Sequence, residues 1–268
     1  MTNNNRCDKI RYVKLLQKVI RNRAARHLLQ GDKTASYYII SNLGENINMR
    51  MRKKKNGEQR ITNCSQFLAP EKAEIYNNPK SPFASDAPVC LEIGCGKGAF
   101  ICQNAKKYPE LNFYAMERVR DVMVLALEKA AGMDEGDMIK NLRFIIGDAE
   151  TLTDYFPPES LDRIYLNFSD PWPKKGHAKR RLTHVSKLNI YKSLLKDGAE
   201  LRLKTDNDGL FEFSLEQFEE AGFELLWKTT DLHNSEYNKD NIMTEYERNF
   251  SEKGKNINAA VVVKRKDK

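Results

Sequence analysis

Apolar and polar residues alternate in blocks from residue 89 to the end of the chain. Short runs rich in Val, Ile, Leu and aromatic residues are separated by longer segments with helical periodicity. This is the pattern of parallel strands joined by crossover helices, so we expect a doubly wound α/β sheet. The expected strands are residues 89–93, 112–117, 142–146, 163–168, 199–204, 223–229 and 257–264. One helix is expected to begin near Gly98, and three others are expected over residues 119–131, 184–195 and 210–221.

The first 88 residues follow a different pattern. Residues 6–30 place apolar side chains at helical spacing between Arg and Lys, which predicts a basic helix. Residues 49–60 are cationic without an apolar pattern, and we expect them to be disordered on their own. Residues 61–88 contain four prolines and are expected to hold little regular structure. We therefore divide the chain into an extension (1–48), a basic lead-in (49–88) and one α/β domain (89–268).

Positive charge is concentrated near the start of the chain. The net charge is +8, yet residues 1–60 alone carry 15 Lys and Arg against 4 Asp and Glu, and the remainder carries 30 against 33. Such a patch attracts a polyanion. No apolar run approaches the roughly 18 residues of a membrane span. The five cysteines form no C-x-x-C pair, which favours reduced thiols in a cytoplasmic protein over disulfides or a metal site.

The segment Leu91–Gly98 carries the first candidate chemistry. It reads LEIGCGKG, an apolar strand that runs into glycines at every second position. Glycine there permits positive φ and a close approach of the backbone to a ligand. A tight structural turn is the alternative, and the spacing differs from the G-x-G-x-x-G of dinucleotide sites. Glu92 lies within the strand, where a buried carboxylate requires a cation such as the α-ammonium group of S-adenosylmethionine (SAM).

Two further acids end the next two expected strands. Glu117 lies 21 to 23 residues beyond the glycines and suits ribose hydroxyls, while Asp148 suits an adenine amino group. Taken alone, Glu117 fits a surface ion pair and Asp148 an ordinary turn. Because parallel strands end at one edge of the sheet, acids in series there favour a cofactor site. Its predicted members are Glu92, Gly94, Gly96, Glu117, Asp148 and Ala149.

A second cluster follows the fourth expected strand, in the sequence Asp170-Pro171-Trp172-Pro173. Its two prolines exclude helix and strand pairing, so we expect Trp172 on a stiff, extended loop. Six basic side chains follow within eight positions, at Lys174, Lys175, His177, Lys179, Arg180 and Arg181. An acid, a fixed aromatic ring and a cationic run suit a nucleobase joined to a phosphate backbone, as in RNA. A solvated basic loop is the alternative.

Together these motifs resemble the bacterial tRNA (guanine-N7-)-methyltransferases. The resemblance rests on DPWPKK, KRRL, TDND (205–208) and TEYE (244–247) and covers roughly residues 49–265. It implies a class I SAM-dependent methyltransferase with a Rossmann-like seven-stranded sheet, whose last strand lies antiparallel beside the fifth. It also implies methyl transfer from SAM to N7 of a guanine in the variable loop of tRNA. The expected protein is cytoplasmic, uses no metal or membrane, and is a monomer or homodimer.

The resemblance also implies roles for individual residues. Guanine N7 carries a lone pair and no proton, so the protein must orient the base rather than deprotonate it. We assign that role to Asp170, which would also face the methyl donor, with Asp206 and Glu247 as alternatives. The expected substrate contacts are Lys174, Asp206, Thr244, Glu245, Tyr246 and Glu247, and the expected RNA contacts are Lys175, His177, Lys179, Arg180 and Arg181. Asp206 alternatively caps the following helix, and Trp172 either stacks on the base or packs against the sheet.

Three other functions fit part of the pattern. A non-catalytic RNA-binding module would not need Glu92, Glu117 and Asp148. An NAD-dependent oxidoreductase would share the strand, glycine turn and helix, but the glycine spacing differs and no catalytic His or Tyr pattern is present. An amino-group methyltransferase would carry a polar residue and Pro-Pro-aromatic in place of Asp-Pro-Trp-Pro.

Residues 1–48 fit three interpretations. They are an RNA-binding extension, an Arg-rich transit peptide, or upstream sequence that is not translated, since the family motifs begin near Met49. A chain that begins at Met49 is expected to bind SAM and methylate tRNA at nearly the full rate, because every motif follows that residue. Calorimetry with SAM and a tRNA methylation assay on both chain lengths check this. A folded but inactive short chain would show that residues 1–48 belong to the enzyme.

Overall fold

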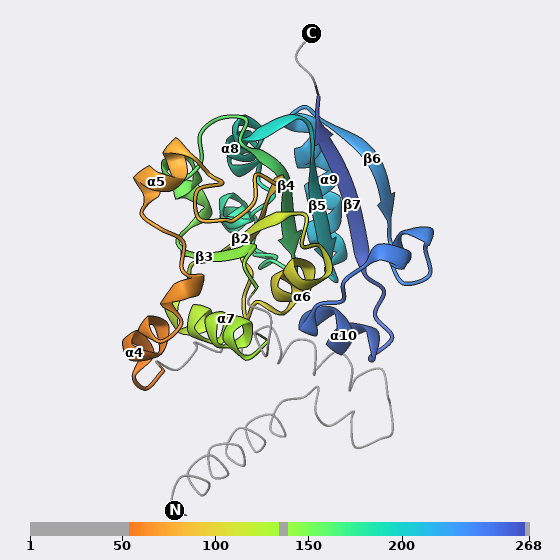
Figure 1. Cartoon of the computed structure of the whole chain (residues 1–268). Helices are drawn as coiled ribbons and strands as arrows, with labels where there is room; N and C mark the ends of the chain where they lie inside the picture. The colour runs from red at the N-terminus through yellow and green to blue at the C-terminus, as the bar shows by residue number, and fades with distance from the viewer. Residues whose placement is uncertain (1–53, 134–138, 266–268) are drawn as a thin grey trace, which may run out of the picture. The chain divides into compact units, whose positions relative to one another are not determined.

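The computed structural model describes residues 54–133 and 139–265 (Figure 1). The predicted helix over residues 6–30 lies outside them, and the division of the chain at residues 48 and 88 stays a prediction. No helix in the described part is long and apolar enough to cross a membrane.

One mixed sheet of seven strands forms the centre of the described chain, in the order β3-β2-β1-β4-β5-β7-β6. Strands β1 to β5 are parallel, and β7 lies antiparallel between β5 and β6, as predicted. The strand order reverses between β1 and β4, which is where ligands bind in such sheets. The strands are β1 Val89–Ile93, β2 Asn112–Glu117, β3 Leu142–Ile146, β4 Leu161–Asn167, β5 Leu195–Thr205, β6 Phe223–Thr229 and β7 Asn258–Lys264.

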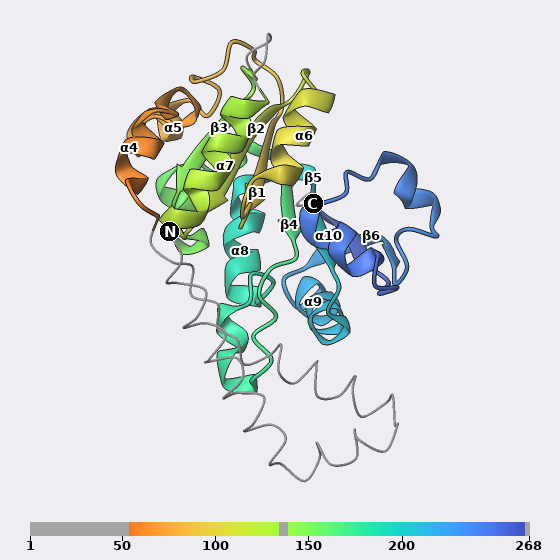
Figure 2. The ribbon, with the colours of Figure 1, turned by 90° about the horizontal axis from the view of Figure 1, so that it is seen from below.

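Helices cover both faces of the sheet (Figures 1 and 2). Figure 1 shows α6 and α7 in front of the sheet and α8 and α9 behind it. Strand side chains alternate between the two layers: Phe113 packs in the α6–α7 layer, and Tyr114 packs in the α8–α9 layer. The central strands are therefore buried on both faces, as parallel strands are. The helices are α6 Ala99–Lys107, α7 Arg120–Gly132, α8 Val185–Leu194 and α9 Asp208–Glu220.

The lead-in segment is more regular than predicted. It contains α4 Gly57–Thr62, a 3₁₀ helix η1 Ser65–Phe67 and α5 Lys72–Asn77. The expectation of disorder is wrong for residues 57–60, and the expectation of little structure after residue 61 is wrong for these helices. Ile61, Phe67 and Ile75 are the buried anchors, one from each helix. One buried residue per helix leaves no periodic signal in the sequence.

The starts of two strands differ from the prediction by more than one residue. β4 begins at Leu161 rather than at residue 163, and β5 begins at Leu195 rather than at residue 199. Leu161 and Leu195 pair with each other and are fully buried. Gly198, with φ of 74°, interrupts the run in β5, which explains why the sequence there reads as a turn.

The contact between α6 and α7 requires glycine at one position. Gly98 precedes α6 with φ of 73°, and a Cβ added there would lie 2.9 Å from Cβ of Ala126 in α7. Gly98→Ala is therefore expected to lower the free energy of unfolding by about 2 kcal/mol or more, through backbone strain and overpacking.

Gly132→Ala is the matched control for that substitution. Gly132 ends α7, and a Cβ there would meet nothing within 4 Å, so the change should be neutral or add about 0.5–1 kcal/mol. Urea unfolding of both variants tests the pair. Equal stabilities would contradict the steric argument.

Candidate active site

The glycine turn after β1 is tied to the end of β2. Gly94 and Gly96 have φ of 77° and 55°, in the left-handed region that glycine adopts without strain. The amides of Gly94 and Cys95 donate to the Met116 carbonyl at 2.8 and 3.0 Å. The Gly96 amide donates to Oε2 of Glu117 at 3.1 Å. The structure thus brings the predicted glycines and the first strand-end acid together.

Glu92 is a buried carboxylate, and only one of its two oxygens has a hydrogen-bond partner in the described chain. The residue is 2 % exposed, and its Oε1 accepts a hydrogen bond from the Asn167 side chain at 2.9 Å. Oε2 has no hydrogen-bond partner among the described residues. Burial raises the pKa of Glu92 to about 7, although the Asn167 hydrogen bond acts against it. A cationic ligand would satisfy this oxygen, so the site fits the predicted ammonium group of SAM.

Asp148 and Ala149 lie at the end of β3. Oδ1 of Asp148 accepts from the Glu150 amide at 3.1 Å, and Oδ2 lies 3.8 Å from a guanidinium nitrogen of Arg118. Asp148 therefore caps the 3₁₀ helix η2 Ala149–Asp154, while its side chain remains partly exposed. Ala149 is buried. Both residues lie at the edge where Glu117 ends β2, as the cofactor prediction requires.

The loop after β4 carries Asp170 between two strained residues. Phe168 and Trp172 have φ of 50° and 41°, which bulky side chains rarely adopt. The prediction that Trp172 is extended is wrong. Asp170 is exposed, and its carboxylate has no hydrogen bond or ion pair with the rest of the described chain.

The basic run after Pro173 forms a 3₁₀ helix, η3 Lys175–Arg180. Lys174, Lys175, Lys179 and Arg180 are exposed. The Arg180 guanidinium lies 4.9 Å from the Trp172 ring, and the His177 ring meets that ring edge-on at 5.8 Å. Arg181 instead donates to backbone carbonyls of the Asp170 loop.

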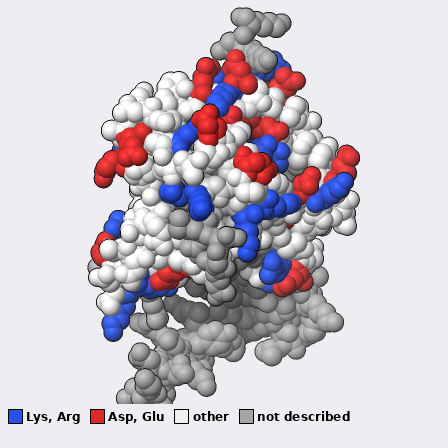
Figure 3. All heavy atoms as spheres, in the orientation of Figure 1, with Lys and Arg blue, Asp and Glu red and all other residues white. Residues whose placement is uncertain are grey.

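Charge elsewhere is mixed. On the face shown in Figure 3, Lys and Arg side chains are interspersed with Asp and Glu. This face therefore offers a polyanion no uniformly basic surface. Among the described residues, no group of three or more His, Cys, Asp or Glu is placed to hold a metal ion.

Asp206 follows β5 and does not cap α9. The cap is its neighbour Asn207, whose side chain accepts from the Leu210 amide at 2.7 Å. Asp206 is half-buried, burial raises its pKa, and no described side chain bonds to it. The capping alternative is therefore filled by Asn207, and the Asp206 carboxylate is hydrogen-bonded only to the backbone of its own residue.

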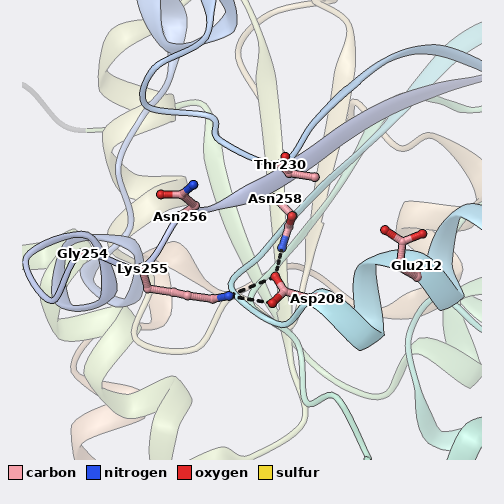
Figure 4. Close-up of a pocket in the computed structure, with 7 residues that line it drawn as sticks. All are labelled: Asp208, Glu212, Thr230, Gly254, Lys255, Asn256 and Asn258. Carbon is pink, nitrogen blue, oxygen red and sulfur yellow. Dashed lines mark hydrogen bonds and ion pairs between the residues drawn. The ribbon is translucent and has the colours of Figure 1, made fainter. Parts of the chain in front are cut away.

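Asp208 has a structural role next to Asp206. Its carboxylate accepts from Lys255 at 2.8 Å and from Asn258 at 2.9 Å, beside a polar pocket of about 460 Å³ (Figure 4). Since Asn258 begins β7, these bonds fix the start of α9 against that strand.

The motif TEYE (244–247) begins a helix. In α10 Glu245–Ser251, Thr244 Oγ1 accepts from the Glu247 amide at 2.9 Å, and Glu247 Oε2 accepts from the Thr244 amide at 3.3 Å. This is a capping box, for which Thr-x-x-Glu is the sequence signature. That signature was present in the sequence and would have predicted the helix.

Glu247 is fully buried and engaged by protein groups. Its oxygens lie 2.7 Å from Lys204 Nζ and 2.8 Å from His233 Nε2, and the Asn241 side chain also donates. Burial alone would raise the pKa of Glu247, but the Lys204 charge and these hydrogen bonds hold it below its ordinary value. Asp170 and Asp206 therefore offer carboxylates that no described side chain engages, and a direct Glu247 contact with guanine stays a prediction.

Lys204 was missed by the sequence analysis. Its ammonium group, on a residue 8 % exposed, also donates to the Ile242 carbonyl at 2.9 Å and lies 4.9 Å from the Phe100 ring. Its charge also acts on Glu92. The available signal was a lysine at the end of a central strand that parallel packing buries on both faces.

Tyr246 brings α10 beside the Asp170 loop. Tyr246 is 63 % exposed, and its ring lies 6.3 Å from that of Phe168 and 6.0 Å from that of Phe250, measured between ring centres. An exposed aromatic ring thus lies next to the residue that begins the acid-bearing loop.

Sequence comparison identifies the family. Residues 86–260 match the family described as "Putative methyltransferase". The chain is 44% identical over 211 residues to the tRNA (guanine-N(7)-)-methyltransferase of Limosilactobacillus reuteri, which covers 78% of this chain and 96% of that protein. It is 49% identical over 175 residues to the protein of that name from Staphylococcus epidermidis, covering 65% of this chain and 79% of the relative. The chain belongs to the tRNA (guanine-N7)-methyltransferase family.

Several solved methyltransferase structures have a fold similar to that of this chain. "Structure of an antibiotic related Methyltransferase" aligns with a TM-score of 0.53 at 17% identity, covering 73% of this chain and 94% of that one. The 16S rRNA methyltransferase KamB aligns with a TM-score of 0.53 at 15% identity, covering 73% and 95%. These similarities confirm the class I methyltransferase fold.

The unsatisfied oxygen of Glu92 predicts a pH-dependent stability. A carboxyl whose pKa is raised in the folded state keeps its proton while the unfolded chain loses it. Stability of the ligand-free protein should therefore fall as pH rises from about 4.5 to about 7.

Glu92→Gln should remove this dependence. At pH 8 the ligand-free variant is expected to melt at a higher temperature than the wild type. It should bind SAM at least about tenfold more weakly, because a charged hydrogen bond is worth about 1.5–3 kcal/mol. Thermal melts at pH 5.5 and 8 and calorimetry with SAM test both statements. A variant less stable than wild type at pH 8 would contradict the stability prediction, and an unchanged SAM affinity would contradict the binding prediction.

Proposed function

We propose that this protein transfers a methyl group from SAM to N7 of a guanine in the variable loop of tRNA. Methylation of tRNA guanine at N7 follows from its family, and the variable loop is our finer assignment. The observation that carries the proposal is the buried, half-bonded Glu92 at the sheet's switch point in a chain of this family. A non-catalytic RNA-binding module or an oxidoreductase would have no need of a buried carboxylate that binds the ammonium group of SAM.

The residues at the ends of β1, β2 and β3 suit the methyl donor. Glu92 would accept from the α-ammonium group, and the turn at Gly94 and Gly96 would receive the methionine backbone. Glu117 would accept from the ribose hydroxyls, since each carboxylate oxygen has acceptor capacity beyond the amides it already holds. Asp148 and Ala149 would hold the adenine. When bound, SAM supplies an electrophilic methyl group on a sulfonium centre.

The loops after β4 and β5 suit the acceptor base. Because guanine N7 has a lone pair and no proton, these residues need only orient the ring, and orientation can be worth about 7–11 kcal/mol of the barrier. The free carboxylate of Asp170 would accept from guanine N1–H and the exocyclic amine, and would stabilise the positive charge that develops on the ring. Asp206 and Lys174 are the further candidates at this edge.

Aromatic and basic side chains suit the rest of the RNA. Lys175, Lys179 and Arg180 are exposed and would bind phosphates, with His177 beside them. Both rings have two neighbours, Arg180 and His177 beside Trp172 and two aromatic rings beside Tyr246, but Tyr246 is 63 % exposed whereas Trp172 is only partly exposed. We therefore assign base stacking to Tyr246 rather than to Trp172.

We further propose that the protein acts in the cytoplasm on its tRNA substrate. Whether it does so as a monomer or a homodimer is decided by sedimentation of the free protein and of its tRNA complex.

The position of the modified base can be mapped directly. Unmodified tRNA transcripts are incubated with the protein and labelled SAM, then treated with borohydride and aniline, which break the chain at N7-methylguanine. We expect one break, at the variable-loop guanine, and no incorporation when that guanine is replaced by adenine. A break elsewhere would contradict the variable loop, and incorporation without a break would contradict N7.

Asp170 variants separate orientation from proton abstraction. Asp170→Ala and Asp170→Asn are both expected to lower kcat/KM for tRNA by about 10²-fold or more, since Asn presents a donor where guanine also donates. At saturating SAM, where Glu92 no longer titrates freely, the wild-type profile should stay flat from about pH 6 to 8. A neutral ionisation that disappears in Asp170→Asn would make this residue a general base and N7 the wrong acceptor.

A further inference from the structure

Arg180 and Arg181, the last two residues of the basic run after Pro173, make different contacts. Arg180 is exposed, and its guanidinium lies 4.9 Å from the Trp172 ring centre. Arg181 donates from Nε to the Pro171 carbonyl at 2.9 Å and from a terminal nitrogen to the Trp172 carbonyl at 3.1 Å. Its guanidinium also lies 4.2 Å from the ring of Phe213 in α9. Two neighbouring arginines thus face different partners.

The Asp170 loop needs an external constraint. Phe168 and Trp172 flank Asp170 in left-handed conformations, each of which costs roughly 1–3 kcal/mol for such a side chain. Trp172 also precedes a proline, which favours an extended backbone instead. The planar guanidinium of Arg181 binds two successive carbonyls of this loop at once, a geometry that a lysine ammonium does not reproduce.

The residues after Arg181 attach the same segment to two other parts of the site. A Cβ added at Gly94 would lie 3.7 Å from Leu182, so the Leu182 side chain lies over the donor turn. Thr183 is fully buried, and its hydroxyl accepts from Ser214 of α9 at 2.8 Å. The Val185 amide donates to the side chain of Gln217, also in α9, at 2.9 Å.

Helix α9 therefore supports both acid-bearing loops. Phe213, Ser214 and Gln217 hold residues 181–185 along one side of the helix. The first turn of the same helix is capped by Asn207, the residue directly after Asp206. A shift of Arg181 relative to α9 would change where Asp170 lies with respect to Asp206.

We propose that Arg181 is a positioning residue: clamped on Phe213, it fixes the Asp170 loop against α9 and the donor turn, and it does not bind tRNA phosphate. The inference rests on the proposed function and assigns Arg181 a role different from the RNA contact expected of it from sequence. Lys175, Lys179 and Arg180 then carry the salt-dependent binding.

The test uses Arg181→Ala, Arg181→Lys and Phe213→Leu in the full chain, with Arg180→Ala as the matched neighbour. Three quantities are measured for each: the single-turnover methylation rate at saturating SAM and tRNA, the tRNA Kd as a function of salt, and the accessibility of Trp172. The chain has two tryptophans, so Trp227→Phe leaves Trp172 as the sole reporter for acrylamide quenching.

All three clamp variants are expected to lower the single-turnover rate, Arg181→Ala by about 10²-fold, as a misplacement of about 1 Å can do. Arg181→Lys should recover little of it, although it keeps the charge. Trp172 should become more accessible to acrylamide, with the salt slope of tRNA binding unchanged. Arg180→Ala should instead reduce that slope by about 0.7–0.9, the share of one phosphate contact.

The opposite pattern would overturn the proposal. It consists of a flattened salt slope in Arg181→Ala, binding restored by Arg181→Lys, and unchanged quenching. If Arg181→Ala does not fold, Arg181→Lys and Phe213→Leu decide by the same readouts. Because quenching requires neither SAM nor tRNA, a failure of the proposed function, seen as an inactive wild type, is distinguishable from a failure of the clamp.

Discussion

A single buried ammonium group, that of Lys204, links the donor and acceptor sides of the site. It ends β5 in contact with Glu247 of α10, and its charge also acts on Glu92 of β1. A buried cation without an anionic partner costs several kcal/mol, so α10 must fold back onto the end of the sheet. Lys204 is hydrogen-bonded to Glu247 and acts on Glu92 only through its charge, so one oxygen of Glu92 keeps no hydrogen-bond partner in the described chain. A ligand that brings a hydrogen-bond donor with positive charge to this oxygen would both complete its bonding and stabilise the ionised carboxylate.

The sheet could be predicted from sequence because its signals are local. β1, β2, β3 and β6 have the predicted bounds, since each is an apolar run bounded by turn residues. The starts of β4 and β5 could not be predicted, because pairing of Leu161 with Leu195 sets them. The same holds for α4, whose ion pair from Arg60 to Glu128 joins residues far apart in the chain.

The site was predictable as a set of strand-end acids, but not in how those acids divide their roles. Topology alone places Glu92, Glu117 and Asp148 on one edge. The burial of Glu247 follows from Lys204, 43 positions earlier, and the half-bonded state of Glu92 follows from Asn167, 75 positions later. Such partners leave no mark in local composition. The capping box at Thr244 is different, because its Thr-x-x-Glu signature is local and can be recognised in the sequence alone.

The carboxylates fall into two kinds: those whose hydrogen bonds are made within the protein, and those that remain available to ligands. Glu247 and Asp208 have their bonds made within the protein and hold α10 and α9 in place. Asp170 and Asp206 do not, and both lie at the carboxyl edge. Two histidines also have structural roles: His184 caps α8, and His233 is bonded to Glu247. A reaction at an unprotonated ring nitrogen needs no base, so a site with free carboxylates for orientation, and with these imidazoles engaged in structure, suits that chemistry.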